Sequence, residues 1–423
     1  MPLLSLGASE ASLLALSFAL PRRYPFYLTS CGAGWDVLFS FPEEVEVFDD
    51  SATLATYSQK LHGALPQDHA APWPFSGGWF VYLSYDLAAV NKRTTEPLGL
   101  IAKVPAAILR KGKELFFAYE AGYASLEKAV LQDLKNLPRL PDIAPPLRVC
   151  FEEEPAEDFL KGVLKVQEAI ARGETYQVNL ARQWQAYLDQ AVLPHLLFQN
   201  LNTINPAPFS ALVTIPGTPY SLLSASPERL VHVKQGTIET QPIAGTRPRL
   251  LGKEKEVCQA LLAHPKERSE HIMLVDLARN DVAQVSTPGS VQVSSLLDVT
   301  TYAYVHHLES TIKARLDDGV GAGDIITALF PGGTITGCPK KHTMSLIEQI
   351  EKTPRGAYTG SVGYISRDGQ MDLNILIRTL VMRDTHITFK TGAGIVADSN
   401  PTFELEETRA KAQGLMLALE QRI

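Results

Sequence analysis

The sequence predicts an α+β fold, in which helices and antiparallel strands occupy separate stretches of the chain. Segments with apolar residues at alternate positions, typical of strands, outnumber segments with helical spacing. Turn signals such as Asp368-Gly369 and Arg383-Asp384 join successive strands directly, without the helix that a parallel connection needs. The length of 423 residues allows two or three cores or one large composite core.

The composition is that of an ordinary globular enzyme. Hydrophobic residues make up 45% and charged residues 20% of the chain, which excludes a disordered protein. A net charge of −7 argues against a nucleic-acid partner, which favours a basic surface. The four cysteines are far apart and form no CxxC motif, so we expect reduced thiols in a cytoplasmic protein, with neither disulfides nor zinc.

The apolar N-terminal segment, residues 2–20, could be mistaken for a signal peptide. Its basic residues, Arg22 and Arg23, follow the apolar run instead of preceding it, and Glu10 interrupts it. We therefore expect an amphipathic or buried helix there. No segment reaches the roughly 18 apolar residues that a transmembrane helix requires, so the sequence predicts no membrane association.

Prolines are dense between Leu137 and Pro155, which marks either a domain boundary or a surface crossing within one unit. Beyond it, one helical face is predicted to carry Phe159, Val163, Val166 and Ile170, and Gly173 would end the helix. The alternation in residues 176–184 predicts a half-buried strand.

Two further elements follow from local patterns nearer the C-terminus. Alternation around "YVHHLES" predicts a strand in which His306 and His307 face opposite sides of a sheet. The last helix should begin with Asn400 as N-cap and Pro401 in its first turn.

Glu-x-x-Glu pairs occur at three places on predicted helices: Glu267/Glu270, Glu348/Glu351 and Glu404/Glu407. This spacing puts both carboxylates on one face, where they repel each other unless a cation lies between them. Mg²⁺ suits such a pair, because it takes one or two carboxylates together with an anionic ligand. The pair at 348/351 looks like a solvated helix face, so spacing alone leaves a surface role open for the others too. Lys411, four residues after Glu407, fits a surface ion pair or a site equally well.

Two glycine-rich stretches are candidates for close backbone approach to a ligand. In "FPGGTITGCPKKHT", Cys338-Pro339 stands where a phosphate loop requires Lys-Ser/Thr, which excludes an NTPase and leaves a turn with amide groups available to an anion. In "KTGAGIVADS", Gly392 and Gly394 predict a second turn, and the motif is too incomplete for dinucleotide binding.

Three other positions attract attention for their chemistry. His307 is either a general acid or base or a structural residue of the sheet. Arg378 is expected inside an apolar strand, where a buried charge needs an anionic partner from the protein or a ligand. The stretch "ETQPIAGTRPRL", residues 239–250, is a constrained loop that presents itself to a ligand, but Ala244 at its centre has no reactive side chain.

Nine motifs occur in order from Ser226 to Lys411: "SPERL", "PIAGTRPR", "SEHIMLVDLARND", "YVHHLES", "FPGGTITGCPK", "GSVGY", "IRTL", "GAGIVADS" and "ExxExxxK". Together they resemble the chorismate-using enzymes, which include anthranilate synthase component I, aminodeoxychorismate synthase component I, and isochorismate and salicylate synthases. The resemblance implies two packed antiparallel β-sheets flanked by helices. It also implies one composite unit over 1–423, in which residues 1–150 complete the sheets and residues 151–423 bind chorismate.

The resemblance also implies roles for individual residues. Glu270 and Glu407 would hold Mg²⁺, with Glu267 and Glu404 in or just outside its coordination shell. Lys411 and the backbone of Gly392 and Gly394 would complete the pocket for the ring carboxylate.

On the same basis, Arg378 and Tyr358 would bind the enolpyruvyl carboxylate of chorismate. Glu228 resembles the family's proton donor to the departing 4-hydroxyl, and His307 and Thr334 would lie near the ring.

Several stretches, among them "YQVNLARQ", "NPAPFSAL" and "VHHLES", resemble aminodeoxychorismate synthases most, so we expect amination of chorismate to 4-amino-4-deoxychorismate for 4-aminobenzoate and folate synthesis. Ala244 departs from this pattern. Many of these enzymes carry a lysine there, thought to attack ring C2 covalently, whereas alanine is typical of anthranilate synthases. Anthranilate synthase is therefore the alternative. The segment near Ser30 lacks the Leu-Leu-Glu-Ser motif with which many anthranilate synthases bind tryptophan, which leaves a tryptophan site there open.

Ammonia is the expected nucleophile, and no glutaminase signature is present in the sequence, so a separate glutamine amidotransferase subunit is the expected partner. Two other hypotheses stay open. A non-catalytic binding subunit would use the carboxylates as a structural cation site, and an isochorismate or salicylate synthase would use water, although Gln177 stands where those relatives usually place a lysine base.

Overall fold

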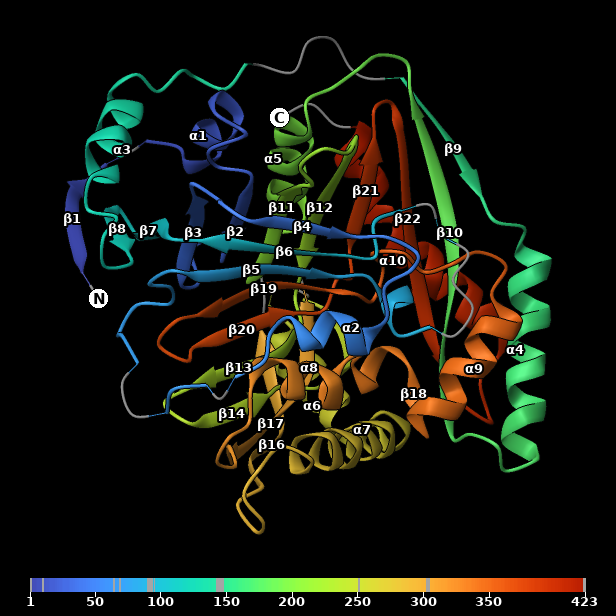
Figure 1. Ribbon diagram of the computed structural model, residues 1–423. Coiled ribbons are helices and arrows are strands. Elements are labelled where there is room, and N and C mark those ends of the chain that lie inside the picture. Colours follow the sequence, from blue (N-terminus) through green and yellow to red (C-terminus); the bar gives the residue numbers. More distant parts are fainter. Residues whose placement is uncertain are drawn as a thin grey trace.

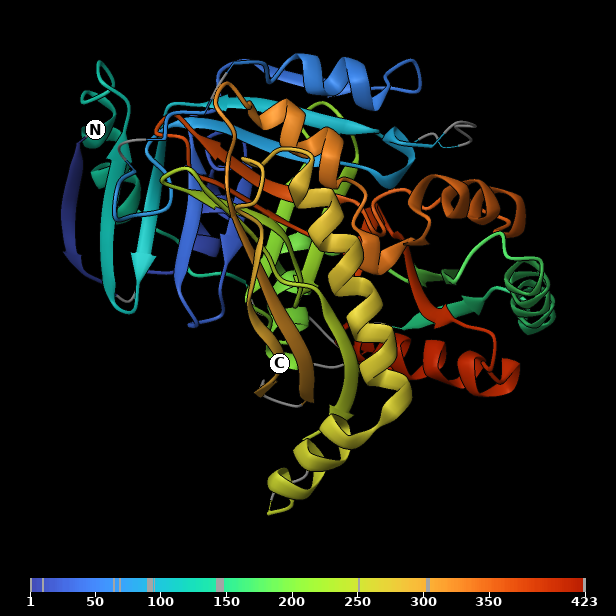
Figure 2. The ribbon, with the colours of Figure 1, turned by 90° about the horizontal axis from the view of Figure 1, so that it is seen from below.

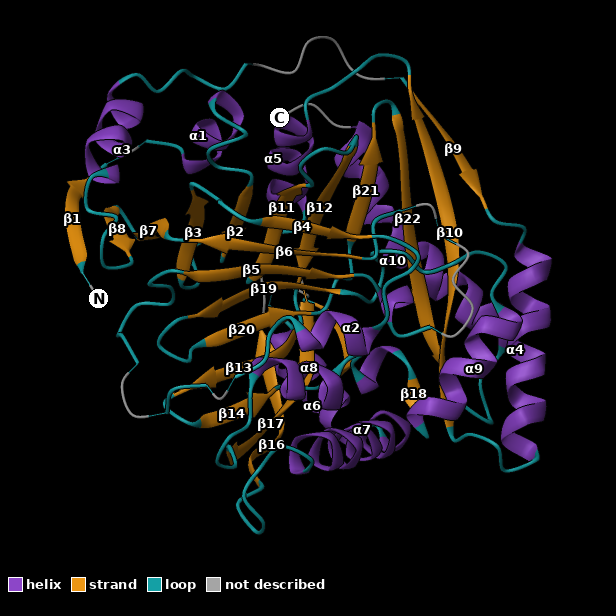
Figure 3. Ribbon diagram, in the orientation of Figure 1, coloured by secondary structure: helices purple, strands orange, loops and turns teal. Residues whose placement is uncertain are grey.

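Two large antiparallel sheets pack face to face, and helices cover their outer faces (Figures 1 and 3). The computed structural model describes residues 2–9, 11–63, 65–67, 70–89, 94, 96–141, 148–249, 252–301 and 305–420. The strands of the two sheets cross steeply in Figure 1. Phe26 of one sheet stacks on Phe80 of the other, with ring centroids 4.1 Å apart, at the centre of the core between them. The α+β prediction is confirmed.

The first sheet runs in the order β1-β8-β7-β3-β2-β11-β12-β21-β22-β10-β18, with β9 paired to β10. Its strands are β1 (Leu3–Ala8), β2 (Phe26–Thr29), β3 (Trp35–Ser40), β7 (Ala106–Lys111), β8 (Glu114–Tyr119), β9 (Val149–Glu153), β10 (Gln177–Leu188), β11 (Phe209–Thr214), β12 (Tyr220–Ser226), β18 (Gly337–Cys338), β21 (Thr379–Arg383) and β22 (His386–Ile395).

The second sheet runs in the order β15-β17-β14-β13-β20-β19-β5-β6-β4, with β16 paired to β17. Its strands are β4 (Val45–Phe48), β5 (Gly78–Leu83), β6 (Gly99–Val104), β13 (Arg229–Lys234), β14 (Thr237–Thr240), β15 (Ile243–Pro248), β16 (Gln292–Thr301), β17 (Val305–Arg315), β19 (Ser361–Ser366) and β20 (Met371–Asn374).

Apolar helix faces close the outer cores. The helices are α1 (Leu13–Ala19), α2 (Leu54–Gln59), α3 (Leu126–Lys135), α4 (Ala156–Ala171), α5 (Pro194–Ile204), α6 (Glu254–Ala263), α7 (Pro265–Ala283), α8 (Ala322–Leu329), α9 (Lys340–Ile350) and α10 (Pro401–Glu420), with short 3₁₀ turns η1 (Tyr85–Leu87) and η2 (Gly333–Ile335). Helices α1, α5 and α10 pack on the first sheet, and α2, α7 and α8 on the second. None of the helices in the described residues is long and apolar enough to cross a membrane.

Strands from before and after the proline-rich stretch lie next to each other in both sheets. β2 pairs with β11 in the first sheet, and β5 pairs with β19 in the second. Residues 142–147, in the middle of that stretch, lie outside the described residues. Each sheet therefore takes strands from both parts of the chain.

Most of the locally predicted elements are confirmed. In α4, Phe159, Val163 and Val166 are buried, and the Gly173 amide ends the helix on the Ile170 carbonyl. The Asn400 side chain accepts hydrogen bonds from the amides of residues 402 and 403 at the start of α10. The predicted turns connect β19 to β20 and β21 to β22.

Three predictions about the sheets and the N-terminus are wrong in detail. The N-terminal apolar segment begins with strand β1 before α1, so only its second half is helical. Strand β10 is buried on both faces where Gln177 and Ala181 lie, while Tyr176 precedes it and is 68% exposed. Both faces are covered because α4 packs on one side and the candidate site lies on the other. Gly392 and Gly394 lie within β22 and not in a turn.

Candidate active site

Glu228 occupies the connection between β12 and β13 and is 5% exposed. The Thr334 hydroxyl, presented by η2, donates a hydrogen bond to Glu228 Oε1 over 2.6 Å. The pKa of Glu228 is raised to about 7, mainly by burial and to a smaller extent by the nearby Glu309 carboxylate, while the Thr334 bond and Lys411 oppose the shift. A carboxyl group in this state is protonated in part at neutral pH and can donate a proton.

His307 lies in β17 and is also buried. Its pKa is lowered to about 4, mainly by burial and to a smaller extent by the positive charges of Arg378 and Lys411, so the ring is neutral at physiological pH. The neighbouring His306 contacts different groups, Cys258 and Thr301, as expected for adjacent residues of a strand. Lys411 is thus close to both Glu228 and His307, and Arg378 to His307.

Arg378 precedes β21 instead of lying inside it, and it is half-buried. Its φ of 50° places it in the left-handed region, which residues other than glycine rarely adopt. The apolar run that suggested a buried strand is interrupted here because the chain turns before it enters β21. The sequence prediction of a buried strand residue is therefore wrong, although the guanidinium lies near His307.

A buried ion pair packs against the Tyr358 ring. The Arg355 guanidinium lies 5.7 Å from the Tyr358 ring centroid and binds Glu351 over 2.7 Å, and both charged side chains are almost fully buried. Arg355 also donates to the backbone carbonyls of Asn179 and Ile335. Glu351 is therefore not part of a solvated helix face, as the sequence had suggested, because the chain folds back at Pro354 and covers it.

The two glycines of β22 bring bare backbone against polar side chains. A Cβ at Gly392 would lie 2.7 Å from the Tyr358 hydroxyl and 2.6 Å from Asn179 Oδ1. A Cβ at Gly394 would lie 2.7 Å from Gln177 Nε2 and 2.9 Å from Glu270 Oε1. A side chain larger than glycine at either position would displace these groups. The predicted turn is wrong, and the close approach of this backbone to a ligand remains a prediction.

Glu270 of α7 and Lys411 of α10 both lie against the Gly392–Gly394 segment of β22, and Figure 2 shows the backbones of the two helices in yellow and dark red. On α7, Glu270 Oε1 accepts a hydrogen bond of 2.6 Å from Gln177 Nε2, and Glu267 forms an ion pair with Arg247 of β15. On α10, Glu407 binds Lys411 over 2.7 Å, and the Lys411 ammonium donates to the Gly392 carbonyl over 2.9 Å. Glu404 is buried.

The metal role of these glutamates remains a prediction. Among the described residues, no three acidic, histidine or cysteine side chains converge as a metal cluster. The glutamate carboxylates are nevertheless the type of ligand that Mg²⁺ binds. The ion needs only one or two carboxylates and fills its other positions with water and substrate oxygens. The structure brings together the lysine, glycine and glutamate groups that the sequence nominated on separate elements.

Ala244 lies in strand β15, paired with Leu308 of β17, and not in a loop. A bulge at Gly245, whose φ is 63°, separates the Ala244–Leu308 pair from the Thr246–His307 pair. The Gly245 backbone also hydrogen-bonds to His307. Position 244 is thus adjacent to the site and carries only a methyl group.

Sequence analysis missed the supporting side chains. Gln177 and Asn179 share one face of β10 and reach Glu270 and Gly392, but each looks like an ordinary polar residue in an alternating strand. Glu351 and Arg355 were missed because their burial depends on contacts distant in sequence. The arginine in "PRGAY" was the available signal, since an arginine beside a glycine turn often has a fixed partner.

The family model described as chorismate binding enzyme matches residues 24–417. The chain belongs to the chorismate-binding enzymes. It is 36% identical to anthranilate synthase component 1 1 of Haloarcula marismortui, over 94% of this chain and 88% of that protein. It is 39% identical to aminodeoxychorismate synthase component 1 of Bacillus subtilis, over 80% of this chain and 70% of that one. Enzymes of this family are generally magnesium-dependent.

Solved structures show the same fold. Anthranilate synthase component I from Streptococcus pneumoniae superimposes with a TM-score of 0.79 at 29% identity, covering 90% of this chain and 92% of that one. The menaquinone-specific isochorismate synthase from Escherichia coli superimposes with a TM-score of 0.77 at 20% identity, covering 99% and 94%. The relatives carry both synthase names, so the family is established and the choice of reaction depends on the site.

Proposed function

We propose that this chain aminates chorismate to 4-amino-4-deoxychorismate, with Mg²⁺ and with ammonia from a separate glutamine amidotransferase subunit, for 4-aminobenzoate and folate synthesis. The observation that carries the amination of chorismate is Glu228, a buried carboxyl with a pKa of about 7 that is held by Thr334. Glu228 would serve either amination, and the choice of 4-amino-4-deoxychorismate follows from the motif resemblance. Removal of the 4-hydroxyl as water requires a proton, and Glu228 is placed to supply it.

The substrate's two carboxylates require cationic and amide partners. Arg378 and the Tyr358 hydroxyl would bind the enolpyruvyl carboxylate, and Lys411 with the Gly392–Gly394 backbone would bind the ring carboxylate. Neutral His307 would pack beside the ring and orient it through one of its ring nitrogens. The buried Arg355–Glu351 pair supports this assignment because it fixes the Tyr358 ring.

Glu270 and Glu407, with Glu267 and Glu404 beside them, would hold the Mg²⁺. When bound, the ion would offset the negative charge of the glutamates and of the ring carboxylate and favour departure of the hydroxyl. Gln177 supports the placement of Glu270, since its amide holds one of the carboxylate oxygens.

Position 244 supplies no nucleophile, so the nucleophile would be a small molecule from outside the chain. Ala244 has no nucleophilic atom, so ammonia or water would do what a lysine does in many aminodeoxychorismate synthases. Relatives named component 1 imply a separate component that supplies ammonia. Gln177 stands where water-using relatives place a lysine base, and its amide is not basic, which disfavours attack by water.

The alternative is anthranilate synthase, and Ala244 is the observation that favours it. Both reactions need the same proton donor, metal and carboxylate pocket, and they differ in the ring carbon that ammonia attacks. In the anthranilate reaction ammonia attacks C2, next to position 244, where a methyl group leaves room for it.

A product assay separates the two. The purified protein is mixed with chorismate, Mg²⁺ and an ammonium salt at raised pH, with and without aminodeoxychorismate lyase. We expect 4-aminobenzoate only when the lyase is present. Anthranilate formed without the lyase would establish the alternative, and binding of chorismate without any turnover would indicate a non-catalytic subunit.

A substitution at position 244 tests the same point from the protein side. We expect Ala244→Lys to change the product ratio or to form a covalent adduct detectable as a mass increase, because the new amine would reach ring C2. Unchanged products together with an unchanged mass would show that position 244 does not face C2. Ala171→Lys, at an exposed position at the end of α4, is the control.

A further inference from the structure

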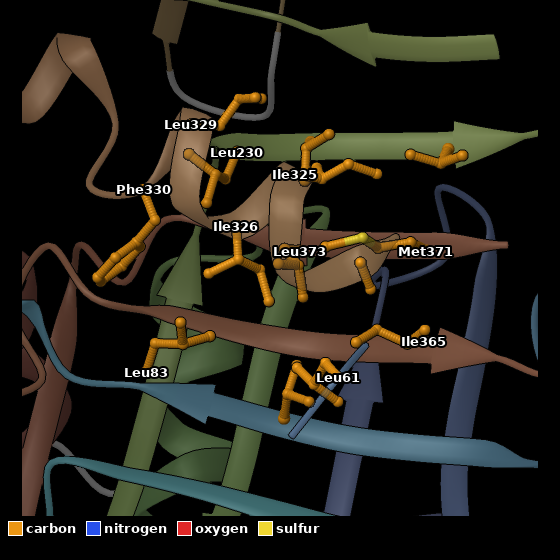
Figure 4. Close-up of a cluster of buried hydrophobic side chains, with 14 of the residues drawn as sticks. Leu61, Leu83, Leu230, Ile325, Ile326, Leu329, Phe330, Ile365, Met371 and Leu373 are labelled. Carbon is orange, nitrogen blue, oxygen red and sulfur yellow. The ribbon is translucent and has the colours of Figure 1, made fainter. Parts of the chain in front are cut away.

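A cavity of about 30 Å³ borders Glu228. Glu228 and Thr334 line it, whereas the described residues around it include none of the predicted carboxylate-binding groups. Apolar side chains of the second sheet's core form much of its wall, and Figure 4 shows two of them, Leu230 and Leu329. A space of this size holds one or two water molecules when polar groups are present to bind them.

Asp281 is the second carboxylate among the described residues that line this cavity. It lies near the end of α7, is 6% exposed, and accepts a bond of 2.6 Å from the Lys340 ammonium at the start of α9. Lys340 also donates to the Leu329 carbonyl over 3.2 Å. Burial raises the pKa of Asp281, while Lys340 opposes that shift. The bond between the two side chains places a proton of the Lys340 ammonium against the Asp281 carboxylate.

Glu228 needs a source of protons. Each loss of the 4-hydroxyl would leave Glu228 as a carboxylate, and at 5% exposure it has little direct access to solvent. The Lys340 side chain is 15% exposed, so the pair reaches closer to bulk water than Glu228 does. The cavity lies between an acid that must be reprotonated and a pair that can supply the proton.

We propose that Asp281 and Lys340 return the proton to Glu228 through water held in this cavity. A cavity water gives one proton to the Glu228 carboxylate and takes one from the Asp281–Lys340 pair, and solvent then restores the proton of the pair at Lys340. Asp281 acts through Glu228 and does not touch the substrate, so it is a positioning residue for proton transfer. The inference rests on the proposed function, but equally on either amination, because both lose the 4-hydroxyl.

Other charged groups near Asp281 and Glu228 have partners of their own, and these partners remain when Asp281 is substituted. Arg229 lines the cavity and is paired with Asp372 over 2.9 Å. On its other sides Glu228 faces Thr334, Glu309 of β17 and Lys411 of α10. Cys338 lies near Asp281, and its pKa is raised mainly by burial. A substitution at Asp281 therefore changes the proton supply while the charges that act directly on Glu228 are retained.

The test compares Asp281→Asn with Asp276→Asn, an exposed position on the same helix whose carboxylate pairs with Arg279. We expect Asp281→Asn to lower kcat roughly tenfold and to increase the solvent deuterium isotope effect on kcat, with KM for chorismate unchanged. Its alkaline limb should move to lower pH because Glu228 is reprotonated more slowly. Asp276→Asn should match the wild type in all four measurements.

Chemical rescue keeps the proposal testable if the asparagine variant is perturbed. Formate should restore activity several-fold to Asp281→Ala, because a small carboxylic acid can occupy the vacated space and carry protons, whereas chloride at equal ionic strength should not. A wild-type isotope effect and kcat in Asp281→Asn, or no rescue of a folded Asp281→Ala, would overturn the relay. A wild-type protein that does not remove the 4-hydroxyl of chorismate would instead overturn the proposed function.

Discussion

The candidate site uses glutamate in two opposite ways. On the β12–β13 connection, Glu228 is enclosed by apolar core and one threonine, and burial keeps its carboxyl close to neutral. On helices α7 and α10, by contrast, Glu270 accepts a bond from an amide and Glu407 pairs with an ammonium. Under the proposed function, the same side chain would be a proton donor in the first environment and a cation ligand in the second.

The largest expected effect comes from Glu228→Gln, which keeps the shape and removes the proton. We expect kcat to fall about 10²- to 10⁴-fold in the chorismate assay, the range of a general acid. The same substitution should increase the free energy of unfolding at neutral and alkaline pH. A carboxyl whose pKa is raised in the folded state destabilises the protein as pH rises from its unfolded pKa of 4.5 towards 7, by about 3 kcal/mol at most.

Thermal denaturation supplies the control for that variant. Glu228→Gln should melt above the wild type at pH 8 and close to it at pH 4, where Glu228 is protonated in both folded and unfolded chains. A variant that loses activity and also melts lower at pH 8 would mean that the folded protein does not raise the pKa of Glu228, contrary to the comparison above.

The next effect should come from Glu270→Gln, on the other side of the comparison. Loss of one carboxylate ligand should weaken Mg²⁺ binding by about 10- to 100-fold, measured by calorimetry in the presence of chorismate. The matched control is Glu406→Gln, an exposed glutamate on α10 that pairs with Arg409. Equal Mg²⁺ affinity in both variants would remove Glu270 from the metal site.

A smaller effect is expected from Gly394→Ala, which leaves every charge in place. The added methyl group would overlap Gln177 Nε2 and Glu270 Oε1, at a cost of about 1–3 kcal/mol. We expect this cost to appear as a rise of about tenfold in KM for chorismate. Gly34→Ala is the control, because the nearest atom to its Cβ would be 3.7 Å away. An unchanged KM in Gly394→Ala would place the substrate elsewhere.

The smallest effect concerns the pH profile. With free ammonia held constant, wild-type kcat should fall as pH rises through about 7, because Glu228 loses its proton. Glu309→Gln should move this limb to lower pH, since the Glu309 charge raises the pKa of Glu228. A limb that stays in place, or moves to higher pH, would show that another group controls it.

Local sequence patterns predicted many helices, strands and turns well. They predicted poorly which side chains contact each other across the fold. The face of α4 and the cap at Asn400 depend on residues a few positions apart, so spacing was sufficient. The strand position of Gly392 and Gly394 and the burial of Glu351 depend on β10 and on Arg355, which spacing cannot reveal. Arg378 lay in an apolar run, yet its left-handed backbone places it before the strand.

The residues of the candidate site were predicted from the order of the nine motifs more than from the periodicity of apolar residues. Neither Glu228 nor Tyr358 has a pattern of its own, and each was nominated through the resemblance. The structure adds what the motifs do not contain, namely the Thr334 bond, the Gln177 bond and the cavity shared with Asp281.

The pairing of β5 with β19 has a consequence for synthesis of the chain. β5 pairs early with β6, but its other edge waits for residues that follow about 280 positions later. At a translation rate of 5–20 residues per second, that edge would stay open for about 15–55 s on the ribosome. An unpaired strand edge can pair with other nascent chains. We therefore expect the yield of folded protein to depend more on chaperone assistance during this interval than on the free energy of unfolding of the finished fold.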